Sequence, residues 1–294
     1  MSRRRALITG ASGQLGSDLH ELLADDWEVT ALAHADLDVT DSEALAGAFE
    51  TARPEAVFNC AAFHNVELCE REESQALAVN VTAVKRIAER CSELGASLVH
   101  LSTNYVFDGR REEPYGEGDL PAPRSVYALS KLAGEHAALA YCDRALVVRT
   151  AGLYGLHGSQ SKGGNFVTRM LERAREQGRL RMVADQRLSP TFTADLAGGV
   201  LAAREAGLTG LMHLTSSGYC SWYEFTQAII ELGGLDVPIE AVATTMPPGG
   251  ADRPRNGVLA AEVARAAGLG PLRPWRQALA DYMARAGLLG RDRA

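Results

Sequence analysis

Cysteine is scarce in this 294-residue sequence, and its five cysteines are an odd number spread along the chain. No Cys-x-x-Cys pair is present, and no histidine stands near a cysteine at the spacing of a metal site. These absences exclude a disulfide-stapled fold, and we predict no metal centre. We expect a reducing, cytoplasmic setting in which the thiols pack as small apolar groups.

Long hydrophobic runs and an excess of basic residues are also missing. No apolar run approaches the roughly 18 residues of a membrane-spanning helix. Residues 1–5 are basic, but only three apolar residues follow before Thr9, so we interpret this segment as a strand and not as a signal peptide. Thirty Lys and Arg stand against 37 Asp and Glu, which gives a net charge of −7. We therefore expect neither nucleic acid nor a membrane as a partner.

Hydrophobic residues make up 46% of the chain, enough for a sizeable core, and the first half alternates short apolar runs with longer helical patterns. This alternation is typical of βαβ units, so we predict an α/β fold with a Rossmann-type doubly wound parallel sheet. The predicted strands are 6–9, 27–32, 56–59, 98–101 and 146–149. The predicted helices between them are 15–24, 42–51, 72–94 and 126–141.

The alternation loosens after residue 150, where five glycines gather between 152 and 164. We predict a helix at 166–177, a strand at 180–183, a Pro-Gly loop at 246–250, and helices at 260–267 and 275–286. The chain then divides into a dinucleotide-binding domain, 1–150, and a smaller substrate-binding region, 151–294. The second is interleaved with the first, so that both form one unit.

The segment Gly10-Ala-Ser-Gly13-Gln-Leu-Gly16 follows the first predicted strand and opens the first helix. In this setting the first glycine permits a tight turn, the second lets the backbone approach a pyrophosphate, and the third packs helix against sheet. The helix N-terminus adds N–H groups and a positive dipole. The spacing therefore predicts a dinucleotide site and not a merely structural turn.

An acidic residue that holds the adenosine ribose is expected about 20 residues after the glycine loop. Asp36 and Asp38 stand near that distance, but the end of the second strand reads Ala33-His34-Ala35 and carries no carboxylate. No arginine that would select a 2′-phosphate stands there either. The sequence leaves the choice between NADH and NADPH open.

Tyr127 and Lys131 are four residues apart, so they share one face of the predicted helix 126–141. An ammonium group there favours the phenolate and lowers the phenol pKa, which makes Tyr127 a candidate proton donor. Thr103 follows the fourth strand at the carboxyl edge of the sheet, where open α/β folds bind ligands. Its hydroxyl is suited to hydrogen-bond the oxygen of a reacting carbonyl.

Together with Asn59-Cys-Ala-Ala62 and Asn80, these motifs resemble the extended short-chain dehydrogenase/reductase family. Further stretches resemble the dTDP-4-dehydrorhamnose reductases within it, over nearly the whole chain. They are Ser102–Gly109, Tyr127–Glu135, Arg149-Thr150, Tyr154-Gly155, Gly164-Asn-Phe166, Asp185-Gln186, Ser189–Asp195 and Arg253-Pro254. The resemblance implies NAD(P)H-dependent reduction of the C4 ketone of a nucleotide-activated deoxysugar.

By the same resemblance, Thr103 holds the carbonyl, Tyr127 protonates it, and Lys131 tunes Tyr127 and holds the nicotinamide ribose. The implied cofactor-binding residues are Gly10, Ser12, Gly13, Gln14, Leu15, Gly16, Asp38, Val39, Cys60, Ala61, Ala62 and Asn80, with Tyr127 and Lys131. The implied substrate-binding residues are Asn104, Gly152, Asn165 and Arg253. Arg253 either clamps the pyrophosphate or lies on a solvated loop, and a homodimer is the oligomer considered.

Three features depart from those reductases. Asn104 stands where Asp is usual, Gly152 where a substrate-stacking Trp is usual, and Leu68-Cys69 where Lys-Ala is usual. Since glycine removes a broad sugar-facing surface, we predict weaker or altered selectivity for the sugar, unless a neighbour such as Leu153, His157 or Phe63 fills the space.

Two other functions remain open at this point. A sugar-nucleotide epimerase uses the same fold without net consumption of the cofactor. A regulatory subunit retains the fold and the dinucleotide without catalysis, and Asn104 and Gly152 keep this hypothesis alive. The presence of Thr103, Tyr127 and Lys131 favours the reductase.

Overall fold

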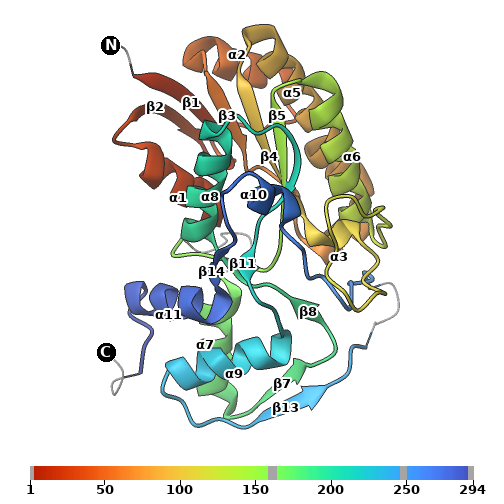
Figure 1. Ribbon diagram of the computed structural model, residues 1–294, viewed down its shortest axis with the longest axis vertical. Helices are drawn as coiled ribbons and strands as arrows, with labels where there is room; N and C mark the ends of the chain where they lie inside the picture. Colours follow the sequence, from red (N-terminus) through yellow and green to blue (C-terminus); the bar gives the residue numbers. More distant parts are fainter. Residues whose placement is uncertain (1–2, 158–163, 246–249, 291–294) are drawn as a thin grey trace.

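Six parallel strands form the central sheet of the computed structural model, in the order β10-β5-β4-β3-β1-β2 (Figure 1). The structure describes residues 3–157, 164–245 and 250–290. The strands are β1 (Arg4–Thr9), β2 (Trp27–Leu32), β3 (Ala56–Asn59), β4 (Ser97–Thr103), β5 (Ala145–Thr150) and β10 (Gly210–His213). The first five confirm the predicted strands, and β10 was not predicted.

Helices cover both faces of this sheet. One face carries α1 (Gln14–Leu23) and α8 (Thr193–Glu205), and the other carries α2 (Ser42–Ala52), α5 (Ala83–Leu94) and α6 (Val126–Tyr141), as Figure 1 shows. Leu15 and Leu19 of α1 are buried against one face of the sheet, while Leu45 of α2 and Ile87 of α5 are buried against the other face. This two-sided burial explains why the strands read as continuous apolar runs.

The predicted helix 72–94 is one helical stretch made of three parts: α4 (Glu73–Leu77), the π-helical turn η1 (Ala78–Thr82) and α5. A π turn holds one more residue than an α turn and is common at functional sites. Its Asn80 carbonyl lies against Gly134 of α6 so closely that a Cβ at position 134 would collide with it. The close approach fixes η1 against α6.

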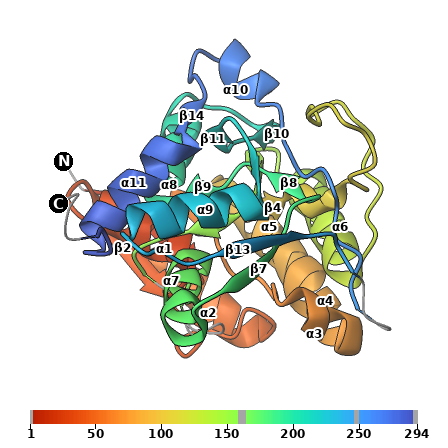
Figure 2. The same ribbon diagram turned by 90° about the horizontal axis from the view of Figure 1, so that it is seen from below.

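The remaining elements after β5 build a second, smaller core below the sheet, seen end-on in Figure 2. Tyr154, Phe192, Phe225 and Tyr282 pack there in stacked, tilted and edge-to-face pairs. The elements are β6 (Leu153–Tyr154), α7 (Phe166–Gln177), β7 (Leu180–Val183), β8 (Arg187–Leu188), β9 (Thr191–Phe192), β11 (Ser216–Ser217), β12 (Cys220–Ser221), α9 (Trp222–Leu232), β13 (Ile239–Val242), β14 (Leu272–Pro274) and α11 (Trp275–Arg285).

Three shorter helices complete the described chain: α3 (Val66–Arg71), the 3₁₀ turn η2 (Asn104–Val106) and α10 (Glu262–Ala266). The predicted helix 260–267 is confirmed as the shorter α10, and 275–286 as α11. Most of the predicted Pro-Gly loop, residues 246–249, and the glycines at 158 and 163 lie outside the described residues. No helix within the described ranges combines the length and the apolar character needed to cross a bilayer.

Candidate functional site

The glycine loop links β1 to α1 at the carboxyl edge of the sheet. Gly10 has a φ of +69°, and a Cβ there would lie 2.7 Å from the backbone nitrogen of Ala61. Gly16 is equally confined, since its Cβ would lie 2.5 Å from the Gly10 oxygen. The loop therefore packs against the residues that follow β3, where the strand order reverses and α/β folds bind ligands.

The N-terminus of α1 is suited to hold phosphate. Gly13 occupies the N-cap, and among the described residues no side chain caps this helix. The first-turn N–H groups thus have no side-chain acceptor, which is the donor arrangement that a pyrophosphate requires. Ser12 lies half-buried in the loop, and the Gln14 side-chain nitrogen lies 3.5 Å from the Leu153 oxygen. The buried Gln14 Oε1 has no hydrogen-bond partner among the residues that the structure describes.

Three cofactor residues named from the sequence have side chains committed elsewhere. Leu15 and Val39 are buried in the two cores on either side of the sheet, so only their backbones are placed to face a dinucleotide. The Asp38 carboxylate accepts hydrogen bonds from the Thr40 N–H and hydroxyl, and these bonds lower its pKa. Cys60, Ala61 and Ala62 remain half-buried beside Gly10.

Thr103 and Tyr127 meet at the carboxyl end of β4. Thr103 is the last residue of the strand, and its hydroxyl lies close enough to the Tyr127 phenol to oppose the rise in the phenol pKa that burial causes. The Thr103 oxygen also accepts the Tyr105 N–H at 3.2 Å, which fixes the side chain at the start of η2. The two hydroxyl groups are thus brought together, as the sequence predicted.

Lys131 lies on the same face of α6 as Tyr127, and its side chain is buried. Its Nζ donates to the Leu101 oxygen at 2.6 Å and lies 3.4 Å from His100 Nε2. Burial lowers the pKa of Lys131 to about 8, while the carboxylate of Glu135 opposes this shift. His100 is itself buried against Asn59, and burial together with the lysine charge lowers its pKa well below the usual value.

The expected direction of the Tyr127 pKa shift was wrong. Burial raises the pKa of Tyr127, since the phenolate loses its hydration, and the Thr103 hydroxyl offsets only part of this effect. The Lys131 ammonium donates to the backbone of β4, so it is not aimed at the phenol. A phenol that stays protonated at neutral pH is suited to act as an acid.

Sequence reasoning missed a buried ion pair beneath the site. Glu135 accepts two hydrogen bonds from Arg149, at 2.8 and 2.6 Å, and a third from the Ser102 hydroxyl. Both charged side chains are 3% exposed. The signal was present, because Glu135 follows Lys131 by four residues and Arg149 is a charge inside an otherwise apolar strand.

Two amides predicted to contact ligands have hydrogen-bond partners within the protein. Asn80 accepts the Phe63 N–H, and it donates to the Phe63 oxygen and the Ser130 hydroxyl, so it joins the chain after β3 to α6. Asn165 caps α7 through the Thr168 N–H and donates to the Gly155 oxygen and the Tyr282 hydroxyl. Each buried amide satisfies backbone groups that the fold would otherwise leave unpaired.

Arg253 lies beside the hydroxyl pair. It donates to Glu67 at 2.8 Å and also hydrogen-bonds the Tyr105 phenol, whose ring lies edge-on to Tyr127 at 5.7 Å. The arginine is 42% exposed, so its guanidinium remains open to solvent at the mouth of the site. Tyr105 and Glu67 were missed because their partner, Arg253, is remote in the sequence.

Leu188 and Pro190 lie beside Gly152. Gly152 has a φ of +57°, and a Cβ there would lie 2.6 Å from Leu188 Cδ1 and 3.2 Å from Pro190 Cα. Leu188, which was not among the neighbours considered, therefore fills the space where a side chain at position 152 would begin. Asn104 is also turned away from solvent, because its amide donates to the Gly257 oxygen at 3.0 Å.

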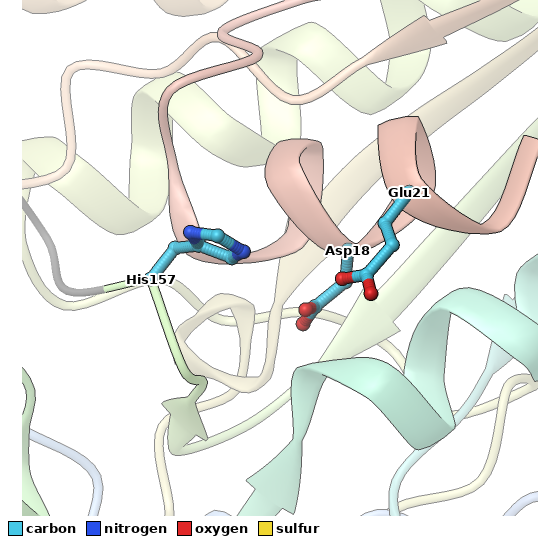
Figure 3. Close-up of side chains that lie close together, drawn as sticks. All are labelled: Asp18, Glu21 and His157. Carbon is cyan, nitrogen blue, oxygen red and sulfur yellow. The ribbon is translucent and has the colours of Figure 1, made fainter. Parts of the chain in front are cut away.

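A separate polar cluster lies between α1 and the loop after β6, as Figure 3 shows. Ligand atoms of Asp18, Glu21 and His157 lie within 4.8 Å of one another; Asp18 is buried, and the other two are exposed. Burial raises the pKa of Asp18, and a hydrogen bond with Thr193 opposes the shift. Exposed acidic groups of this kind are common without a metal, and we assign none to them.

Comparison with known proteins agrees with this geometry. Residues 4–287 match the family model described as RmlD substrate binding domain. The chain is 40% identical to the dTDP-4-dehydrorhamnose reductase of Streptomyces griseus, with 98% of this chain and 96% of the relative covered. It is 41% identical to a probable dTDP-4,6-dihydroxy-2-methyloxan-3-one 4-ketoreductase of Streptomyces antibioticus, with 94% of each covered.

Among solved structures, the dTDP-4-dehydrorhamnose reductase of Bacillus anthracis in complex with NADP superposes with a TM-score of 0.91 at 32% identity. The match covers 97% of this chain and 99% of that one. The Rossmann-type fold predicted from the sequence is confirmed. The chain therefore belongs to the RmlD substrate binding domain family, which places it with the dTDP-4-dehydrorhamnose reductases among the extended short-chain dehydrogenases/reductases.

Proposed function

We propose that the protein is an NAD(P)H-dependent oxidoreductase that reduces the C4 ketone of a dTDP-activated deoxysugar, with dTDP-4-dehydrorhamnose as the first substrate to test. The observation that carries the proposal is the meeting of Thr103 and Tyr127 at the sheet edge, with Lys131 behind them. The relatives named above act on substrates of this class.

The glycine loop fits the dinucleotide. Gly10 to Gly16 supply backbone N–H groups at the start of α1, and the half-buried residues Cys60 to Ala62 line the cleft beside them. NADPH is the first cofactor to test, since the Bacillus anthracis structure contains NADP, and NADH is the second. When bound, the reduced nicotinamide supplies a hydride to the carbonyl carbon.

The residues of this chain then manage the oxygen and the proton. The Thr103 hydroxyl donates a hydrogen bond to the ketone oxygen, and Tyr127 gives its proton to that oxygen as negative charge develops there. Lys131 contributes a buried positive charge that favours the resulting phenolate, and the family resemblance supports a role for it in holding the cofactor ribose. Arg253 offers its exposed guanidinium to the substrate pyrophosphate.

The division of the chain at residue 150, a cytoplasmic location and a homodimer form part of the same proposal. The smaller core around Tyr154 and Phe225 would carry the sugar-binding side of the cleft. Light scattering of the purified protein, with and without NADPH, tests the dimer.

The decisive experiment follows NADPH absorbance while the protein acts on dTDP-4-dehydrorhamnose. A reductase consumes the cofactor in proportion to the ketone. An epimerase forms product without net consumption, and a regulatory subunit does neither. Either of the last two outcomes contradicts the proposal.

A further inference from the structure

Asn104 joins the reacting end of β4 to a distant part of the chain. Its Nδ2 donates to the Gly257 oxygen at 3.0 Å, and its Oδ1 lies 3.4 Å from the Thr103 hydroxyl. The side chain is 5% exposed. One amide thus contacts both a proposed catalytic residue and the backbone of residues 253–257, which we name the Arg253 segment.

The Arg253 segment is held at several points beside the site. The Asn256 amide donates to the carbonyls of residues 111, 112 and 113, and the Gly257 N–H donates to the Arg187 oxygen at 2.8 Å. At its other end, Arg253 pairs with Glu67 and hydrogen-bonds Tyr105. In the described structure, Asn104 is the residue that ties this segment directly to the strand end carrying Thr103.

The contact between positions 104 and 257 depends on an amide donor at the first and on the lack of a side chain at the second. A carbonyl oxygen accepts only from a donor, and the Asn104 amide supplies one. A carboxylate of the same shape would face the Gly257 oxygen with a second acceptor and leave both buried groups unsatisfied. A Cβ at position 257 would collide with Asn104 Nδ2, so glycine lets the amide approach the backbone.

We propose that Asn104 is a positioning residue, which sets the Arg253 segment against the Thr103–Tyr127 pair and thereby determines how tightly the sugar nucleotide is held. This inference rests on the proposed function of the site. It gives a physical reason for the departure at position 104, since the Asn104 amide donates to the Gly257 carbonyl.

The first test is Asn104→Asp in the full chain. The carboxylate repels the Gly257 oxygen and leaves a buried acceptor unpaired. We therefore expect KM for dTDP-4-dehydrorhamnose to rise about 10- to 100-fold at pH 8. The protonated acid is a donor again, so KM should return toward the parent value as pH falls. We expect kcat and the Kd of NADPH to change less than about threefold, because neither depends on the position of the segment.

The second test is a cycle between positions 104 and 257. Gly257→Ala alone should raise KM, because its methyl group displaces the Asn104 amide. In Asn104→Ala the space is vacant, so Asn104→Ala/Gly257→Ala should be no worse than Asn104→Ala. Asn65→Asp is the matched control, since Asn65 is exposed and caps α3 as an acceptor, a role that aspartate performs equally.

The outcomes distinguish a failure of the proposed reductase function from a failure of the positioning role of Asn104. If the parent protein does not reduce the ketosugar, the proposed function fails, and the Kd of dTDP for the NADPH-loaded parent and Asn104 variants still tests positioning. Weaker binding of dTDP in Asn104→Asp that recovers at low pH supports the inference. A parent-like KM or Kd at every pH, a loss confined to kcat, or additive losses in the cycle overturns it. If Asn104→Asp does not fold, Asn104→Ala should raise KM or the Kd of dTDP without recovery at low pH, and a parent-like value in Asn104→Ala overturns the inference.

Discussion

At the residue scale, the site separates two tasks that the sequence suggested were coupled. Tyr127 is kept protonated by burial, and Lys131 is a buried cation held by the backbone of β4. The Tyr127 phenol, which donates the proton, and the Lys131 ammonium, which stabilises the phenolate as it forms, are therefore not paired before the reaction. Reduction is favoured, because the acid holds its proton until a ketone oxygen takes it.

Tyr127→Phe tests the acid. The variant keeps the ring that packs against Tyr105 but has no proton to give, so kcat should fall about 10²- to 10⁴-fold. The Kd of NADPH, measured by fluorescence titration, should stay near the parent value. Near-normal turnover would mean that another group delivers the proton.

The pH dependence belongs to Lys131. Because burial lowers its pKa to about 8, the lysine loses its charge above that pH, and kcat/KM should fall there. The stability of the cofactor-free protein should change with pH in the opposite direction to kcat/KM. Between pH 8 and 10.5 the unfolded lysine binds a proton that the folded one has lost, so stability rises with pH in that window.

Lys131→Met should abolish this rise and stabilise the cofactor-free protein at pH 7 by about 1–3 kcal/mol, because it removes a buried charge. Activity should be lost and NADPH binding weakened. Urea unfolding at pH 7 and pH 10 measures the change. A parent whose stability is flat across the window contradicts the argument.

At the element scale, buried polar groups fasten the helices to the sheet. Glu135 of α6 and Arg149 of β5 form the ion pair described above, with Ser102 of β4 as a third member. Neither charged side chain is exposed to water, so each depends on the other to compensate its charge. The contact fixes the helix that carries Tyr127 and Lys131 relative to the strand that carries Thr103.

Glu135→Gln should destabilise the protein by about 3–5 kcal/mol, since it leaves the Arg149 charge buried without its counter-ion. The matched control is Glu240→Gln, whose exposed pair with Arg181 should contribute less than about 1 kcal/mol. Urea unfolding compares the two variants. Equal losses would show that burial of the pair does not matter.

Sequence alone predicted the elements better than it predicted amide partners. The four-residue spacing placed Tyr127 and Lys131 on one helical face, and the apolar runs placed five strands of the central sheet. The partners of Asn80 and Asn104 within the protein, Phe63 and Gly257, could not be predicted, because tertiary packing sets them. Leu188, which fills the space beside Gly152, was missed for the same reason.

At the scale of the whole molecule, the two halves of the chain share one core. Leu196 and Val200 of α8, with Met212 of β10, pack in the same cluster as Ile8 of β1. The sheet also takes its edge strand β10 from the second half. The dinucleotide-binding half is therefore completed by later residues.

A fragment of residues 1–150 should not fold on its own, because it lacks α8 and β10 and exposes the apolar face that they cover. Circular dichroism and thermal denaturation of the fragment test this, and the full chain should unfold in one transition. A cooperative transition in the fragment would contradict the shared core and support an autonomous first domain.

The π turn at Ala78–Thr82 has a consequence for the lengths that relatives of this chain can tolerate. A π turn closes one turn of the helix with one extra residue, so deleting one residue there would restore α-helical geometry and leave the residues on either side on their present faces. Ile87 and Cys91 of α5 would stay in the core, whereas Asn80, which lies within the turn, would lose its place beside Ser130. Elsewhere in this helix each residue advances the chain by about 100°, so a deletion there would rotate every later residue out of its packed position, and changes of length should concentrate in this turn and in exposed loops.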